Sequence, residues 1–166
     1  MELRDITADD VPLYESLYCD PSMMEHLGGA WPKERAPGKL RQNLEVVEAG
    51  TAWVFKVIPD GSHEAAGSVC VWEHIWRGEP ISEIGWMILP PFQGRGLATQ
   101  AVRAILEKAR TKRRWNIIHA FPATANAPSN AVCRKAGFTL IEECELAWDG
   151  HVIRCNHWLL DLRSTP

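Results

Sequence analysis

The spacing of apolar residues in the first fifty positions predicts one strand and two helices. Thr7 has the polar side chain of a helix cap, and Asp9 and Asp10 bring negative charge to the first turn after it. Gly50 stands where a helix C-terminal glycine is favoured. Residues 23–38 mix glycine, proline and tryptophan, which predicts a loop with room for one short helix. The expected elements are a strand over 2–6 and helices over 8–19 and 39–49.

The middle of the chain has the pattern of strands. β-branched and aromatic residues dominate the segments 52–58, 66–72 and 81–89. Turn residues separate these segments, first around Gly61 and then over 77–80. Strands joined by such short turns pair antiparallel with their neighbours. We therefore expect an antiparallel meander of three strands.

Beyond this meander the period becomes helical again. Leu97, Ala101 and Ile105 recur every four residues and form one apolar stripe, which predicts a helix over 96–112. The remaining expected elements are a strand over 115–120, a helix over 126–136, and strands over 138–148 and 151–160 around the type I′ turn signal Asp149-Gly150. No linker or repeat divides the chain, so 1–166 is expected to form one α+β domain. Its sheet should be mixed and mostly antiparallel, with about seven strands flanked by about four helices.

Composition and charge exclude several classes of function. The formal charge of −3 and the pI near 6.1 argue against a protein that coats nucleic acid. No apolar run reaches the roughly 18 residues of a membrane span, and the first residues lack the features of a signal peptide. The five cysteines and six histidines show neither a disulfide framework nor metal-ligand spacing. We expect a reduced, cytoplasmic, metal-free domain that binds neither nucleic acid nor a membrane.

Tryptophan is the unusual feature of the composition, with eight residues against two tyrosines. Large aromatic side chains serve core packing in most proteins. They can also line a cleft for a substrate that has an apolar or cationic part. The side chains expected to face such a substrate are Trp31, Trp72, His74 and Trp76.

A glycine-rich segment stands where the last strand of the meander ends and the next helix begins: Gln93-Gly94-Arg95-Gly96-Leu97-Ala98. Glycine lets the backbone approach a ligand closely, and the free N–H groups of a first helical turn attract an anion. A Walker loop requires Lys-Ser/Thr after its last glycine, which this segment lacks. The dinucleotide fingerprint requires a βαβ unit, whereas an antiparallel meander precedes this segment. Both nucleotide-binding alternatives therefore fail, and the residues alone leave a cradle for the phosphates of a different ligand and a glycine-rich turn without a ligand.

The same segment matches the Q/R-x-x-G-x-G/A signature of the GNAT superfamily of acyl-CoA-dependent N-acyltransferases, which the chain resembles over nearly its whole length. The segment 126–138 is similar to the family's N-x-x-S-x-x-V-x-x-K-x-G-F, and the segment 83–88 resembles its central strand. The start, with Leu3-Arg4, Asp20-Pro21 and Leu27-Gly28, resembles the ribosomal-protein alanine N-acetyltransferase branch. Three ordered motifs at family spacing are more specific than the glycines alone.

The resemblance implies that acetyl-CoA is the co-substrate and that its pantetheine arm lies where the central strand splays from its neighbour. A main-chain N–H near Met87 or Ile88 would then hold the oxyanion. The basic residues over 108–114 suit the end of a helix dipole, with contact to the 3′-phosphate left open for one or two of them. The implied ligands of coenzyme A are Met87, Ile88, Leu89, Gln93, Gly94, Arg95, Gly96, Leu97, Ala98, Asn126 and Ser129.

Acetyl transfer to an amine requires a base, because an amine is protonated at neutral pH. Glu83 is the leading candidate, since it is a carboxylate in an apolar strand where burial would raise its pKa. The resemblance also implies a glutamate here that activates the amine through water. Glu73 and His74, expected at the turn before this strand, are reserves, and His119 at the end of the next strand is a further titratable group.

The proton donor to the leaving thiolate is open between two residues. Many family members have a tyrosine four residues before the Gly-Phe pair of the last motif, but this chain has Cys133 there. A cysteine can donate a proton or fill space as a small buried residue. The ribosomal branch instead suggests Ser129, whose hydroxyl could hydrogen-bond the sulfur. Asn126 fits both a helix N-cap and a ligand of the pantetheine amides.

These observations predict an N-acetyltransferase that acts on a primary amine of a small molecule or of a protein N-terminus, by direct attack in a ternary complex. The missing tyrosine leaves open a non-catalytic acyl-CoA sensor. A modifier of protein lysines or ribosomal proteins would keep the chemistry and change the partner. A homodimer through the C-terminal strands is common among look-alikes of the family.

Overall fold

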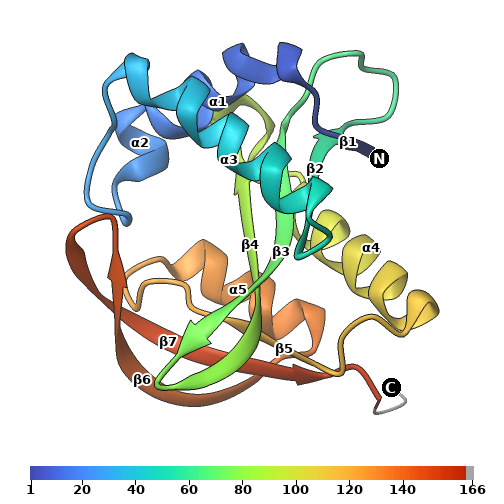
Figure 1. Ribbon diagram of the computed structural model, residues 1–166, viewed down its shortest axis with the longest axis vertical. Coiled ribbons are helices and arrows are strands. Elements are labelled where there is room, and N and C mark those ends of the chain that lie inside the picture. Colours follow the sequence, from blue (N-terminus) through green and yellow to red (C-terminus); the bar gives the residue numbers. More distant parts are fainter. Residues whose placement is uncertain (164–166) are drawn as a thin grey trace.

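The computed structural model of the protein describes residues 1–163, in which one seven-stranded sheet has helices on both faces (Figure 1). The strand order is β1-β2-β3-β4-β5-β7-β6, and only β4 and β5 run parallel. The strands are β1 Glu2–Asp5, β2 Ala52–Ile58, β3 Gly67–Trp76, β4 Glu79–Ile88, β5 Ile117–Ala120, β6 Thr139–Trp148 and β7 His151–Asp161. The expected mixed, mostly antiparallel sheet of an α+β fold is confirmed.

Five α-helices lie within residues 1–163: α1 Val11–Tyr18, α2 Pro21–Met24, α3 Ala36–Glu48, α4 Leu97–Lys112 and α5 Ala127–Ala136. Helix α2 begins at Pro21, two residues before the expected loop, because the Asp20 carboxylate accepts hydrogen bonds from the N–H groups of Ser22 and Met23. Helix α3 begins three residues earlier than expected. Pro37 explains this, because a first-turn proline has no N–H that the helix needs. Short 3₁₀ helices add Ala8–Asp10, Lys33–Arg35 and Pro90–Phe92.

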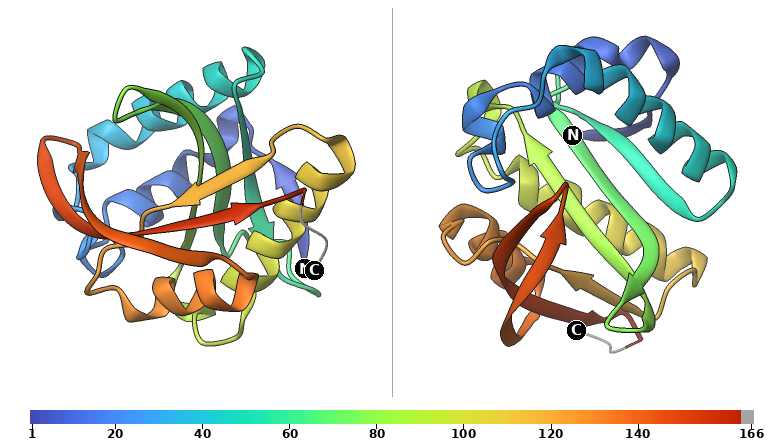
Figure 2. Two further views of the ribbon diagram at one scale, coloured as in Figure 1. Left: turned by 90° about the horizontal axis from the view of Figure 1, so that it is seen from below. Right: turned by 60° about the vertical axis from the view of Figure 1, so that its left-hand side comes forward.

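The long helices divide between the two faces of the sheet, as the left panel of Figure 2 shows for α3 and α5. Helices α1 and α3 bury Leu13, Leu17 and Leu40 against β2 and its neighbours. On the other face, α4 buries the predicted stripe of Leu97, Ala101 and Ile105 in the largest core cluster. The apolar sides of α1 and α3 thus cover one face of the sheet, and the apolar side of α4 covers the other.

The hairpin of β3 and β4 is longer than the sequence pattern predicted. Its turn consists of Arg77 and Gly78 alone, at φ 50° and 83°, rather than of the four expected residues. Two successive left-handed residues give the tight turn whose twist suits a hairpin. Pro80 therefore lies inside β4, opposite Ile75. The longer strands bring Trp76 over β7, where its ring packs 4.8 Å from that of His157.

The parallel pair β4 and β5 is joined at a single register position, Glu83 opposite His119. Strand β3 by contrast pairs with β4 over its whole length, from Gly67 opposite Ile88 to Trp76 opposite Glu79. The C-terminal half of β4 therefore has a paired edge toward β3 and an open edge toward β5. This splay is the feature on which the expected pantetheine gap depends.

Candidate active site

The loop after β4 presents free backbone donors at the start of α4. Gly94 and Gly96 both have left-handed backbones, at φ 72° and 77°. Gly96 is the N-cap of α4, and within residues 1–163 no side chain caps this helix. A Cβ at Gly94 would meet nothing within 4 Å, and one at Gly96 only the side-chain amide of Gln100 at 3.8 Å. Free N–H groups and the positive end of a 16-residue helix make this an anion cradle.

Gln93 ties this cradle to the strand before it. Its side-chain Nε2 donates a 2.8 Å hydrogen bond to the carbonyl oxygen of Ile88. That carbonyl is the last of β4, so the bond holds the loop against the strand end. Arg95 stands between the two glycines, and Leu97, the first residue of α4, is buried in the core. The predicted role of these residues toward coenzyme A stays a prediction.

The hydrogen-bond register of β4 decides which amides face the open edge. The N–H of Leu89 donates to Ala66 on the β3 side, at 2.8 Å. Because N–H groups alternate between the two edges of a strand, the N–H of Met87 also faces β3. The N–H groups of Ile88 and Trp86 face the gap. Of the two predicted oxyanion donors, this geometry favours Ile88 over Met87, and it adds Trp86, which sequence reasoning missed.

Glu83 lies in the middle of β4 with only 8% of its surface exposed. Its Oε2 is 2.7 Å from Nε2 of His74 on β3. Burial raises the pKa of Glu83, and the hydrogen bond to Glu83 raises the pKa of His74. A raised carboxylate pKa is closer to the value at which proton transfer is efficient near neutral pH. Glu83 therefore has the burial and the partner that suit a general base.

Glu73 is in the wrong place for the role of reserve base. Strand β3 extends to Trp76, so Glu73 and His74 belong to a strand rather than to the expected turn. Adjacent residues of a strand point to opposite faces, which separates Glu73 from the pair of His74 and Glu83. The Glu73 carboxylate accepts a 2.7 Å hydrogen bond from Nε1 of Trp115 instead.

The start of α5 carries the other predicted ligands. The Asn126 side chain accepts a 3.0 Å hydrogen bond from the N–H of Ser129, which confirms its role as N-cap. Ser129 is half-buried. Cys133, one turn further along, is fully buried in the core beneath α4, and burial raises the pKa of its thiol to about 12. This environment favours packing for Cys133 and leaves Ser129 as the better-placed candidate proton donor.

The three tryptophans expected to face a substrate lie in three different environments. Trp72 stacks on His74 with ring centroids 6.1 Å apart. Trp76 packs between Phe121 and His157. Trp31 stacks on the ring of Tyr18 at 4.8 Å, in the loop before α3. Only Trp72 therefore belongs to the same group of side chains as Glu83, and the substrate role of each tryptophan stays a prediction.

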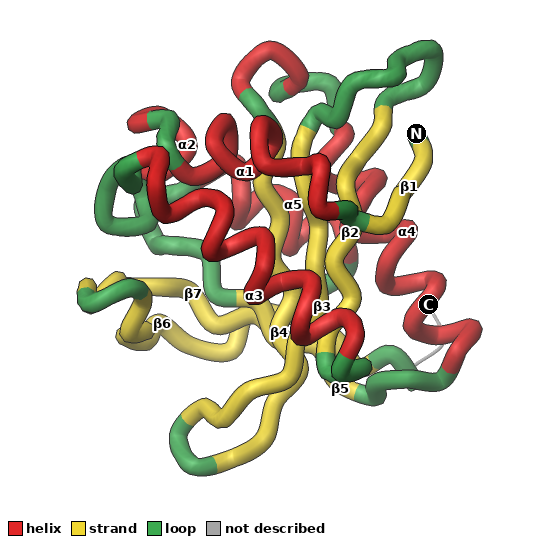
Figure 3. Tube along the Cα trace, turned by 45° about the horizontal axis from the view of Figure 1, so that its top comes forward, coloured by secondary structure: helices red, strands yellow, loops and turns green. Residues whose placement is uncertain are grey.

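A clasp joins the tip of the β6–β7 hairpin to the loop before α3, and Figure 3 shows the two segments side by side. Arg35 donates two hydrogen bonds to the Asp149 carboxylate, at 2.6 and 2.9 Å, and lies over the Trp31 ring at 3.9 Å. The hydrogen bond from Arg35 lowers the pKa of Asp149. His151 packs on Gly28 so closely that a Cβ at Gly28 would lie 2.4 Å from the imidazole. Sequence reasoning missed this clasp, because its partners are 114 residues apart.

Replacing Arg35 with alanine is expected to release the hairpin tip. The bidentate ion pair and the cation–π contact would both be lost, and the backbone amides around Asp149 should then exchange with solvent faster. Hydrogen-exchange mass spectrometry measures this effect. Arg154→Ala is the matched control, because it removes an exposed ion pair with Glu143 within the hairpin itself. Equal exchange at the tip in both variants would show that the clasp does not hold it.

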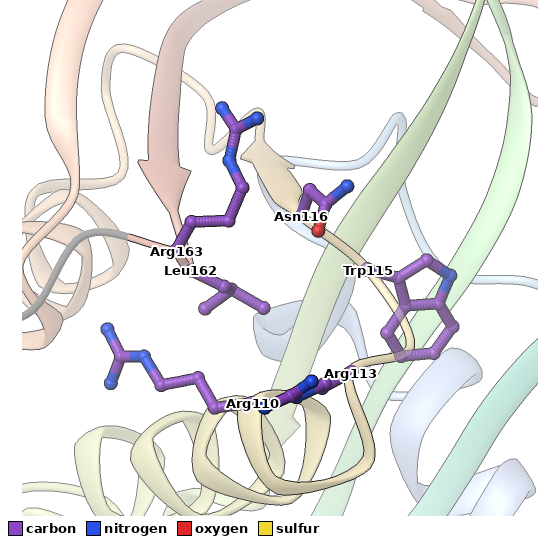
Figure 4. Close-up of a pocket in the computed structure, with 6 residues that line it drawn as sticks. All are labelled: Arg110, Arg113, Trp115, Asn116, Leu162 and Arg163. Carbon is purple, nitrogen blue, oxygen red and sulfur yellow. The ribbon is translucent and has the colours of Figure 1, made fainter.

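A cavity of about 230 Å³ lies at the other end of α4, lined by Arg110, Arg113, Trp115, Asn116, Leu162 and Arg163 (Figure 4). Two of the basic residues over 108–114, Arg110 and Arg113, line it at the C-terminal end of α4. At about 1.5 Å of rise per residue, the length of α4 separates them from the Gly94–Gly96 cradle. In Figure 4 the side chains of Arg110 and Arg163 extend away from each other. This geometry argues against a contact of these two residues with the 3′-phosphate of coenzyme A, which the sequence left open.

Comparison with known families identifies the chain. A family model described as an acetyltransferase (GNAT) domain matches residues 1–139. The protein belongs to the GNAT acetyltransferase family. This GNAT chain is 29% identical over 119 residues to a Bacillus subtilis (strain 168) protein described as the uncharacterized N-acetyltransferase YnaD. The match covers 71% of this chain and 66% of that protein.

Solved structures share the fold of this GNAT chain at low sequence identity. One is RimL, a ribosomal L7/L12 alpha-N-protein acetyltransferase in complex with coenzyme A, at 19% identity and a TM-score of 0.78 over 96% of this chain and 92% of that one. Another is a ribosomal-protein-S5-alanine acetyltransferase from Vibrio fischeri, at 17% identity and a TM-score of 0.78 over 96% and 91%. The predicted resemblance to the superfamily is confirmed, and ribosomal-protein acetyltransferases are among its structural neighbours.

Two further features of the GNAT chain bear on its ligands. Across residues 1–163, no group of three or more His, Cys, Asp or Glu side chains is arranged to hold a metal ion. In the same part of the chain, none of the helices has the length and apolar character required to cross a membrane.

Proposed function

We propose that this protein transfers the acetyl group of acetyl-CoA to a primary amine. The observation that carries the proposal is the order of three features from β4 to the start of α4. The uncapped amides at Gly94 and Gly96 lead into the open edge of β4, and that edge leads to the buried carboxylate of Glu83. The cradle suits the pyrophosphate of coenzyme A, and the open edge suits the amides of its pantetheine arm. The solved structure of RimL, which shares the fold, is described as a complex with coenzyme A.

The reaction follows from Glu83, from the N–H groups on the open edge of β4 and from Ser129. Glu83 takes a proton from the ammonium form of the acceptor, directly or through a water, and leaves a neutral amine. The amine nitrogen forms a bond to the acetyl carbon, and the carbon–sulfur bond breaks. The N–H groups of Ile88 and Trp86 are placed to donate to the carbonyl oxygen as negative charge develops on it. The second proton of the amine goes to the thiolate, with the Ser129 hydroxyl as its candidate donor.

The acceptor enters on the face of the sheet that carries Glu83. Trp72 and His74 lie beside this carboxylate, so the acceptor amine meets a planar aromatic surface and one buried acid. An aromatic face next to a carboxylate suits a cation. These contacts favour a primary amine that arrives protonated. They are compatible with both a small molecule and a protein N-terminus, and RimL is described as acting on a protein N-terminus.

Release of free thiol from acetyl-CoA, measured with a panel of amines, tests the proposal. The panel should include small amines, polyamines, amino-acid analogues and peptides with alanine or serine N-termini. We expect thiol release with at least one class of amine, together with an acetylated product 42 mass units heavier (about the mass of an acetyl group less one hydrogen). Binding of acetyl-CoA without turnover on any amine would favour the acyl-CoA sensor. Acetylation confined to lysine side chains would favour the protein modifier.

A further inference from the structure

Four titratable side chains lie in one row across four neighbouring strands. Glu83 on β4 is opposite His119 on β5. His119 is opposite Leu159 on β7, so His157, two residues before it, shares its face. His157 is in turn opposite Glu142 on β6. The sheet order thus connects the candidate base in the centre of the molecule with an exposed carboxylate on the edge strand.

The two histidines in this row form a direct hydrogen bond. Nδ1 of His119 is 2.8 Å from Nε2 of His157, and the rings stack with centroids 5.1 Å apart. His157 is 5% exposed, and its Nδ1 has no hydrogen-bond partner among the described residues. That nitrogen points along the row, 3.9 Å from Oε1 of Glu142. A buried polar atom without a partner is costly, so the arrangement calls for a role beyond packing.

The surroundings favour the uncharged form of both histidines. Trp76 and Phe121 each pack 4.8 Å from the His157 ring. Burial lowers the pKa of His119 to about 4, and burial also lowers the pKa of His157, against the effect of Glu142. A neutral imidazole accepts a proton at one nitrogen and donates at the other, which is the property of a proton carrier.

We propose that His119 and His157 form a proton relay that carries the proton collected by Glu83 to Glu142. The inference rests on the proposed function, which requires Glu83 to discharge one proton in every turnover. Glu83 is the register neighbour of His119 on the same face of the sheet, and its Oε2 is already bonded to His74. The relay therefore begins at Glu83 in the central strand and ends at Glu142 on the edge strand.

The proton balance of the relay is simple. Nε2 of His119 accepts the proton from Glu83, and the proton on its Nδ1 passes to Nε2 of His157. The proton on Nδ1 of His157 passes to Glu142, which releases it to solvent. After the products leave, Nε2 of His119 gives its proton to water in the emptied site, the proton on Nε2 of His157 returns to Nδ1 of His119, and Nδ1 of His157 takes a proton from solvent through Glu142, which restores the first tautomers. The charged groups that face the row are His74 on β3 and Arg77 at the β3–β4 turn, which holds Glu142 at 2.5 Å.

His157→Gln tests the relay, because an amide preserves hydrogen bonding but does not transfer a proton onward. In the steady state with acetyl-CoA and an accepted amine, we expect kcat to fall by roughly tenfold or more, with the KM of acetyl-CoA unchanged, because Glu83 must discharge its proton before it can serve the next turnover. In His157→Ala, added imidazole should restore the rate in proportion to its concentration. Phe121→Leu is the packing control, since it disturbs the same aromatic cluster and leaves both imidazoles in place.

Several outcomes would overturn the relay. One is a His157→Gln rate within twofold of the wild-type rate. Another is an equal loss in Phe121→Leu together with no rescue of His157→Ala by imidazole, which would make the pair a packing feature. A thermal melt of each variant confirms that it is folded before its rate is compared. If Glu83→Gln is inactive while His157→Gln is fully active, the relay alone fails. If Glu83→Gln is itself fully active, the proposed role of Glu83 as base is contradicted, and the relay loses its starting point.

Discussion

Gly96→Trp is expected to abolish the binding of coenzyme A while leaving the protein folded. The indole would cover the N–H groups at the start of α4, which the described residues leave uncapped. It would also stand where the backbone must come within hydrogen-bonding distance of a phosphate. The left-handed backbone at φ 77° makes any side chain here cost about 1–2 kcal/mol. That cost is small enough for the fold to survive, because a Cβ at Gly96 has open space around it.

Isothermal titration with coenzyme A measures this effect. Gly50→Trp is the matched control, since Gly50 has a φ of 74°, also has open space around a Cβ, and lies after α3. The two variants should lose similar stability, whereas only Gly96→Trp should lose affinity. Coenzyme A at 100 times its Kd should stabilise the control by about 2.7 kcal/mol and leave Gly96→Trp unchanged. Undiminished affinity in Gly96→Trp would remove the basis for placing coenzyme A at this loop.

Glu83→Gln is expected to lower kcat/KM for the amine by roughly 100-fold to 10,000-fold, with the affinity for acetyl-CoA unchanged. The amide keeps the size of the side chain and a hydrogen bond to His74 but accepts no proton from the acceptor. The change should appear in kcat as well as in kcat/KM, because proton removal precedes the attack. Steady-state kinetics with the best amine of the panel measures the loss.

The raised pKa of Glu83 also predicts how activity changes with pH. Glu83 acts as a base only when ionised, and burial raises its pKa above the ordinary value of 4.5. Activity that depends on Glu83 is therefore present above the raised pKa and declines as the pH falls through it. We expect the acid limb of the kcat/KM profile above pH 4.5 in the wild type and its absence in Glu83→Gln. Glu73→Gln, which changes a carboxylate on the opposite face of β3, should leave the limb in place. A limb that survives in Glu83→Gln would assign the base to another group.

Local patterns in the sequence predict much of the fold. The β-branched and aromatic residues over 52–58, the stripe of α4 and the turn signal at Asp149 each specify an element from neighbouring residues alone. Where expectation and structure differ, longer-range packing decides. The β3–β4 hairpin extends to Trp76 because Phe121 and His157 cover its aromatic tip, and no local signal predicts that contact.

In the candidate site, too, some features are predictable from the sequence and others depend on how the strands pair. Glu83 and the glycine loop were predictable, because a carboxylate in an apolar strand and two glycines before a helix are unusual in any sequence. The separation of Glu73 from His74 was not, since it depends on β3 continuing through both residues. The choice of Ile88 and Trp86 over Met87 depends on hydrogen-bond parity, which only the pairing with β3 establishes.

The glycine cradle, the helix behind it and the family were thus determined by the sequence itself, because each depends on residues that are close together in the chain. The splay of β4 from β5, the partner of Glu83, the clasp between Arg35 and Asp149, and the row from Glu83 to Glu142 were decided by the tertiary structure. Each of these joins strands or loops that are distant in sequence. Register and sheet order bring them together, and a pattern read along a single chain contains neither.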